Sequence, residues 1–77
     1  MKIRRINLKN GDYIRIGDFA TECHETNEYL ITEIREFSIV DSEGILTHGF
    51  HILNKDIQLA WIPYHVITAI FYEVEND

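Results

Sequence analysis

Residues 57–74 have the sequence IQLAWIPYHVITAIFYEV, which contains the only tryptophan and the only proline of the chain. β-Branched and aromatic residues dominate this stretch, as they do in strands. Because proline has no N–H to donate to a sheet ladder, Pro63 belongs at a strand end or on an edge strand. We therefore predict strands over residues 57–62 and 66–74, joined by a tight corner at residues 63–65.

Turn signals divide the preceding sequence into further strands. Asparagine, aspartate and glycine tolerate the backbone conformations that tight turns require. The predicted turns lie at residues 10–11, 41–44 and 54–56, with Gly44 in the left-handed conformation. The strands between them cover residues 12–20, with a sharp bend at Gly17, and residues 45–53, with Leu46, Phe50 and Ile52 facing the core. Residues 1–9 fit either a short strand or one helical turn, and residues 21–26 are polar and predict a loop or strand end.

Residues 27–40 fit two interpretations. Leu30, Ile31, Ile34 and Phe37 would share one face of a helix over residues 27–37. The β-branched and aromatic content of the same segment favours one long, bent strand instead. We favour the strand, and the helix would make the protein α+β.

The strand and turn pattern predicts a single mainly-β domain over residues 1–77. About five strands joined by short turns are typical of a small, strongly bent five-stranded antiparallel barrel of the Sm-like or SH3-like kind. A chain this short buries only about 60% of the surface that its unfolded form exposes, so its core is marginal.

Composition limits the kind of protein further. Cys23 is the only cysteine, so an internal disulfide is excluded and a reducing compartment is indicated. No apolar run approaches the length of a membrane span, and we expect a cytoplasmic protein that contacts no membrane. A nucleic-acid binder usually carries a basic surface, so the net charge of −6 argues against that function. The positive charge is concentrated, however, at Lys2, Arg4, Arg5, Lys9 and Arg15.

Both faces of the final strand are largely apolar. Val66, Thr68, Ile70, Tyr72 and Val74 would lie on one face, and Ile67, Ala69 and Phe71 on the other. One face fills the core of so small a protein, and the other needs a partner. Because an unpaired edge strand also invites pairing with another chain, we predict a cyclic homo-oligomer.

The order of strands and turns resembles that of the Sm-like (LSm) family, in the divergent form found in marine phage-type members. The family's last corner carries an Ile-Arg-Gly-Asp/Asn-x-Ile/Val motif. The corresponding positions here are Ile62, Pro63, Tyr64, His65, Val66 and Ile67, so the flanking aliphatic residues fit and Pro63-Tyr64 replaces the Arg-Gly pair. The family's other motif, an Asp followed by an aromatic-Met-Asn turn, would fall at residues 41–44, where only Asp41 fits. The resemblance implies rings of about five to seven subunits, closed by strand pairing between neighbours, that bind RNA.

Candidate binding residues follow from the aromatic corner, the turns and the basic side chains. Tyr64 and His65 would stack on single-stranded bases, and Asp41 and Ser42 would form the second turn of the binding site. Arg4, Arg5 and Lys55 would meet phosphates. The candidate subunit interface comprises Ile57, Leu59, Trp61, Ile67 and Phe71, although Trp61 also fits a place in the core.

Catalytic and metal sites are not predicted. Cys23, His24, His48 and His51 are the residue types that bind zinc, but strand positions three apart point to opposite faces. No sequence feature resembles a nucleophile elbow, a phosphate-binding glycine loop or a carboxylate pair. We therefore expect no enzyme activity and no cofactor.

Two functions remain open. The first is a ring-forming protein that binds RNA or single-stranded DNA without catalysis. The second is a structural or adaptor homo-oligomer that binds only protein partners, which the net charge and the absent Arg-Gly pair favour.

Overall fold

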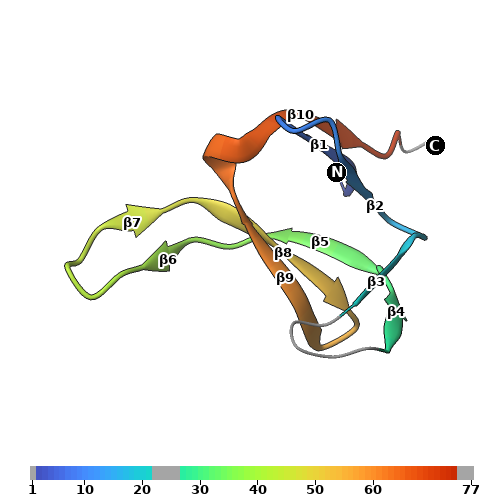
Figure 1. The fold of residues 1–77 in the computed structure, drawn as a ribbon, viewed down its shortest axis with the longest axis horizontal. Coiled ribbons are helices and arrows are strands. Elements are labelled where there is room, and N and C mark those ends of the chain that lie inside the picture. Colours follow the sequence, from blue (N-terminus) through green and yellow to red (C-terminus); the bar gives the residue numbers. More distant parts are fainter. Residues whose placement is uncertain (1, 22–26, 75–77) are drawn as a thin grey trace.

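The computed structural model describes residues 2–21 and 27–74, and it is built almost entirely from antiparallel strands (Figure 1). The elements are β1 (Ile3–Leu8), β2 (Tyr13–Arg15), β3 (Phe19–Thr21), β4 (Glu28–Leu30), β5 (Glu33–Glu36), β6 (Ile39–Val40), β7 (Leu46–Thr47), β8 (Gly49–Asn54), β9 (Ile57–Pro63), the 3₁₀ helix η1 (Tyr64–Val66) and β10 (Ile67–Tyr72). The predicted mainly-β class is therefore confirmed. In this part of the chain, no helix has the length and hydrophobicity needed to cross a membrane.

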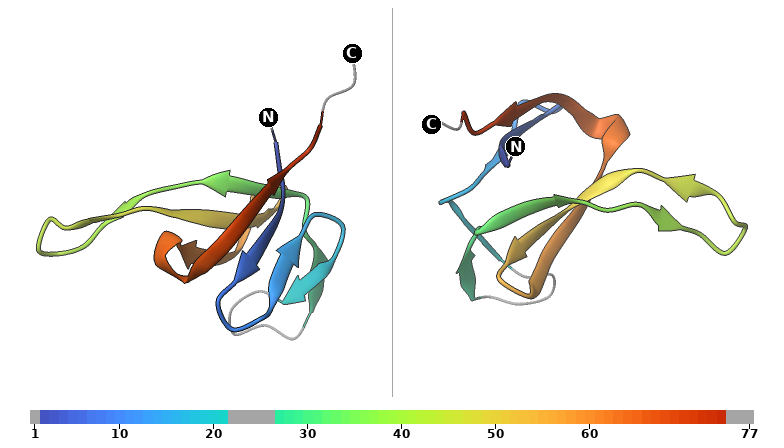
Figure 2. Two further views of the ribbon diagram at one scale, coloured as in Figure 1. Left: turned by 90° about the horizontal axis from the view of Figure 1, so that it is seen from above. Right: turned by 180° about the vertical axis from the view of Figure 1, so that it is seen from behind.

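The strands form four separate antiparallel sheets. Two have three strands each, in the orders β10-β1-β2 and β5-β8-β9, and the hairpins β3-β4 and β6-β7 form two-stranded sheets. The β10-β1-β2 sheet crosses over the β5-β8-β9 sheet, and β6-β7 projects away from both as an arm (Figures 1 and 2). No sheet of the described residues closes on itself, so the closed five-stranded barrel that we predicted is not found.

Residues 27–40 are extended and not helical, so the α+β alternative is wrong. The predicted long strand is instead divided into β4, β5 and β6. Its first break has a clear cause: Ile31 N–H donates to Asp18 O (2.8 Å), whereas the next residue, Thr32, donates to Leu53 O (2.9 Å). The chain changes pairing partner between these residues, and the strand bends there.

The predicted bend at Gly17 and the predicted turn that ends at Gly44 are confirmed by the backbone. Gly17 and Gly44 have φ values of +97° and +80°, which β-carbon-bearing residues rarely adopt. Gly17 makes the sharp bend that separates β2 from β3. Gly44 closes the β6–β7 turn, and its N–H donates to Asp41 O (3.0 Å).

The predicted strand over residues 45–53 is divided at His48 into β7 and β8. Phe50 and Ile52 are buried, as predicted. Leu46 is 54% exposed, so its assignment to the core face was wrong. The reason is that β7 belongs to the arm, which extends beyond the core.

The core is a small hydrophobic cluster between the two three-stranded sheets. It contains Ile6, Ile31, Ile34, Phe50, Ile52 and Leu59. Ile6 is fully buried, and its cross-strand partners Ile14 and Ile70 also pack against the cluster. This row of isoleucines joins the β10-β1-β2 sheet to the rest of the molecule.

A register shift explains why both faces of β10 are apolar. Leu8 pairs with Ile67, but the preceding residue Asn7 pairs with Ala69, so Thr68 is an extra residue. Such a bulge changes the direction in which the following side chains point. Ile67 and Ile70 therefore both pack against the core, and part of the two-faced pattern is satisfied within the chain.

The tight corner after Pro63 is confirmed. Pro63 ends β9, which is an edge strand of its sheet, and η1 turns the chain into β10. Trp61 lies on the same strand, and its Nε1–H donates to Phe37 O (3.0 Å). The indole covers Gly49, its diagonal neighbour on β8, where a β-carbon would lie 2.5 Å from Trp61 Cζ2 and 2.6 Å from Ile62 O.

We predict that Gly49→Ala destabilises the protein by about 1–3 kcal/mol, because the methyl group has no room between the indole and the backbone. Urea unfolding followed by circular dichroism measures the change. Ser42→Ala, in an exposed turn, is the control, with an expected change within about 0.5 kcal/mol. Equal stability of the two variants would contradict the packing described here.

Candidate functional site

The outer face of the β10-β1-β2 sheet carries an array of arginine and aromatic side chains. Side chains alternate between the two faces of a strand, so the burial of Ile6 directs Arg5 and Asn7 outward. Arg5 pairs with Phe71 on one side and with Arg15 on the other. Asn7 pairs with Tyr13. We call Arg5, Asn7, Tyr13, Arg15 and Phe71 the arginine–aromatic face.

Arg5 is the centre of this face. Its guanidinium carbon lies 4.1 Å from the centroid of the Tyr13 ring and 5.9 Å from that of Phe71, within the range of cation–π attraction. Its Nε–H donates to Asn7 Oδ1 (2.8 Å). These contacts hold the guanidinium between two aromatic rings.

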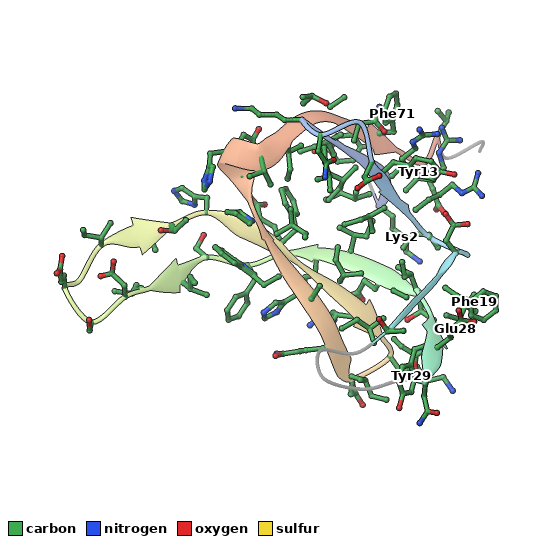
Figure 3. The ribbon with its side chains drawn as sticks, in the orientation of Figure 1. Lys2, Tyr13, Phe19, Glu28, Tyr29 and Phe71 are labelled. Atoms are coloured by element: carbon green, nitrogen blue, oxygen red, sulfur yellow. The ribbon has the colours of Figure 1, made fainter. Side chains whose placement is uncertain are left out.

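The two rings remain accessible. Tyr13 is 47% exposed and Phe71 is 39% exposed. Figure 3 shows both at the β10-β1-β2 sheet, apart from Phe19 and Tyr29 on the β3–β4 hairpin. A planar ligand can therefore reach the parts of these side chains that Arg5 does not cover.

Basic residues are concentrated in the segment that forms β1 and β2, although the protein is acidic. Residues 2–15 contain five Lys or Arg side chains and a single acid, Asp12. Arg15 forms an ion pair with Asp18 (2.9 Å). The hydrogen bond to Asp18 and the charge of that carboxylate raise the pKa of Arg15 above its ordinary value, so Arg15 remains cationic.

The predicted binding residues lie in several places on the molecule. Arg4 and Arg5 lie on β1. Tyr64 and His65 lie in η1, where they line a groove of about 530 Å³ with Glu36, Leu46, Thr47 and His48. The Tyr64 ring stacks on Phe50, with a centroid separation of 6.0 Å.

The remaining predicted residues lie farther away. Asp41 and Ser42 are at the tip of the β6–β7 arm, and Lys55 is in the β8–β9 turn, on a different side of the molecule (Figure 1). Asp41 has a structural role, because its Oδ1 accepts from the N–H groups of Glu43 and Ile45 (both 2.9 Å). The structure therefore does not bring the predicted residues into one site.

The candidate interface residues also separate into groups. Leu59 is only 2% exposed and belongs to the core, so it is not available to a second subunit. Ile57 and Phe71 are exposed, whereas Trp61 and Ile67 are half-buried. Phe71 is thus both a candidate interface residue and part of the arginine–aromatic face.

Of the four candidate zinc ligands, the structure describes His48 and His51, and each contacts another side chain. Cys23 and His24 lie outside the described residues. His51 stacks on Phe37, with ring centroids 4.2 Å apart, and His48 Nδ1 is hydrogen-bonded to Ser38 Oγ (2.8 Å). Within residues 2–21 and 27–74, no group of three or more His, Cys, Asp or Glu side chains could hold a metal ion.

Comparisons with protein-family models, curated proteins and solved structures gave no match. The resemblance to the Sm-like family therefore remains a prediction.

We predict that Arg5→Ala lowers the free energy of unfolding by about 1 kcal/mol, because it removes the cation–π contacts and the hydrogen bond to Asn7. Arg4→Ala, at an exposed neighbouring position, should change the stability by less than about 0.5 kcal/mol. Chemical denaturation of both variants measures the difference. Equal effects would argue against the position of Arg5 between the rings.

Proposed function

We propose that this chain is a non-catalytic protein that binds RNA or single-stranded DNA through the arginine–aromatic face. The observation that carries the proposal is the position of Arg5 between the exposed rings of Tyr13 and Phe71. Proteins that bind single strands combine aromatic platforms for the bases with cationic groups for the backbone, and this face offers both.

The geometry favours single strands over a duplex. Stacking requires the flat side of a base, which is accessible only when the base is unpaired. The rings of Tyr13 and Phe71 are exposed on a sheet surface, and arginine side chains lie beside them. Stacking is possible with every base, so we expect weak sequence preference.

The concentration of positive charge reconciles this proposal with the net charge of −6. Lys2, Arg4 and Lys9 flank the face at the two ends of β1 and would meet phosphates. Binding that depends on phosphate contacts weakens as salt rises, because counterions are released on binding. We therefore expect strongly salt-dependent affinity.

Our proposal includes a cyclic homo-oligomer with about five to seven subunits, as the resemblance to the Sm-like family implies. Two features support self-association. β9 and β10 are edge strands of their sheets, and η1 connects them directly. Ile57 on β9 and Phe71 on β10 are exposed apolar residues. An unpaired edge with apolar side chains favours pairing with another strand.

An adaptor that binds only protein partners is the second candidate function. The β6–β7 arm favours it, because the arm exposes Ile39, Val40, Ile45 and Leu46 on an acidic protein. Exposed apolar patches of this kind mark protein interaction sites.

We predict that the protein binds fluorescein-labelled oligo-U and oligo-A at low salt and releases both at high salt. Tyr13→Ala combined with Phe71→Ala should weaken binding by about 30-fold or more, since stacking contributes about 1–3 kcal/mol per base and both rings are removed. Fluorescence polarisation measures the affinities.

Phe19→Ala is the matched control, because it removes an exposed aromatic ring from the distant strand β3. The affinity of the Phe19→Ala variant for both oligonucleotides should equal that of the wild type. If the wild type binds neither oligonucleotide at low salt, the nucleic-acid proposal is wrong and the adaptor is favoured.

We also predict that light scattering at micromolar concentration gives the mass of an oligomer. The unpaired edges of β9 and β10 are the physical reason. A mass of 9.1 kDa, that of a single chain, would refute the cyclic assembly.

A further inference from the structure

The β6–β7 arm does not pack against the hydrophobic core. It consists of two strands of two residues each, joined by the Asp41–Gly44 turn. It projects away from both three-stranded sheets (Figures 1 and 2). An isolated two-stranded hairpin is marginally stable in water, so a partner that covered the arm would stabilise it.

The side chains of the arm are suited to burial. Val40 is 62% exposed, Ile45 is 55% exposed and Leu46 is 54% exposed. None of them belongs to the core or to the residues packed against it. Val40 and Leu46 are cross-strand partners on one face of the hairpin, whereas Ile45 lies on the other face, so the arm exposes apolar side chains on both faces.

Charge indicates which partner fits the arm. Residues 36–54 contain no Lys or Arg, and Asp41 and Glu43 make the tip of the arm acidic. The arginine–aromatic face has the complementary character, because it combines exposed aromatic rings with the basic residues of β1. An acidic, apolar arm and a basic, aromatic face match in both charge and polarity.

The two surfaces lie at opposite ends of the molecule. The arm extends to one side, and the β10-β1-β2 sheet lies on the other (Figure 1). A chain therefore cannot place its arm on its own face. Pairing of two arms would bring Asp41 and Glu43 of both copies together, which like-charge repulsion disfavours.

We infer that the β6–β7 arm of one copy docks on the arginine–aromatic face of a second copy. The contact is head-to-tail, so repeated docking forms a ring or an open chain. The arm then covers Tyr13 and Phe71, the rings that the proposed function assigns to nucleic acid. Docking of the arm and nucleic-acid binding therefore compete for one surface. The edge pairing proposed for β9 and β10 is a separate contact.

Sedimentation velocity without nucleic acid tests the docking. Glu43→Lys, at the tip of the arm, should weaken self-association by about tenfold or more, because it places a positive charge against the basic face. Asp56→Lys, in the β8–β9 turn, is the matched control, since it changes the net charge by the same amount. Circular dichroism verifies that both variants fold.

The inference requires that the wild type self-associates, that salt weakens this association and that only Glu43→Lys disrupts it. A wild-type monomer, or equal effects of the two variants, would overturn the inference.

Mixing provides a second test. A chain with Arg4→Glu and Lys9→Glu should be monomeric alone, and should form complexes with the Glu43→Lys chain through its own acidic arm. Failure of the mixture to associate would also overturn it.

Competition separates this inference from the proposed function. Oligo-U added to the wild-type oligomer should displace the arm, so the association that Glu43→Lys weakens should also weaken when oligo-U binds. If oligo-U binds and this association is unchanged, the arm does not occupy this face. If oligo-U does not bind at all, the proposed function fails, whereas the docking is still decided by the charge variants.

Discussion

The burial of Ile6 is the constraint on which both the fold and the candidate site depend. Ile6 carries β1 into the core cluster, and its neighbours Ile14 and Ile70 extend the same row across the sheet. This row is the apolar contact that joins the β10-β1-β2 sheet to the β5-β8-β9 sheet. The same packing directs Arg5 and Asn7 outward, since adjacent residues of a strand face opposite sides. The core therefore determines which side chains form the arginine–aromatic face.

Much of the fold could be predicted from local turn chemistry. Gly17, Gly44 and Pro63 each mark a bend or corner that the structure contains, because few backbone conformations are open to them. The division of residues 27–40 could not be predicted. It depends on Ile31 and Thr32 bonding to different segments, and single-residue preferences carry no information about such a change of partner. For the same reason, the arm and the absence of a closed sheet among the described residues were not foreseen.

The candidate site was harder to predict than the fold. The concentration of basic residues near the start of the chain was visible, and Arg4 and Arg5 were identified as binding residues. Tyr13 was not identified, and Arg15 was named only among the basic residues. Their place opposite β1 depends on register. A two-residue turn at Asn10 and Gly11 would pair different residues from those observed, where Leu8 N–H bonds to Asp12 O across a three-residue loop. A slip of one residue turns every side chain to the other face, so the site could not be read without the register.

The central claim is that bases of a single strand stack on the face organised by Arg5. Nuclear magnetic resonance of the ¹⁵N-labelled protein, titrated with unlabelled oligo-U at low salt, tests it most directly. We expect the largest shift changes on the amides of β1, β2 and β10, with the Arg5, Tyr13 and Phe71 signals among them. Shift changes confined to Tyr64, His65 and the groove that they line would show that the bases bind elsewhere.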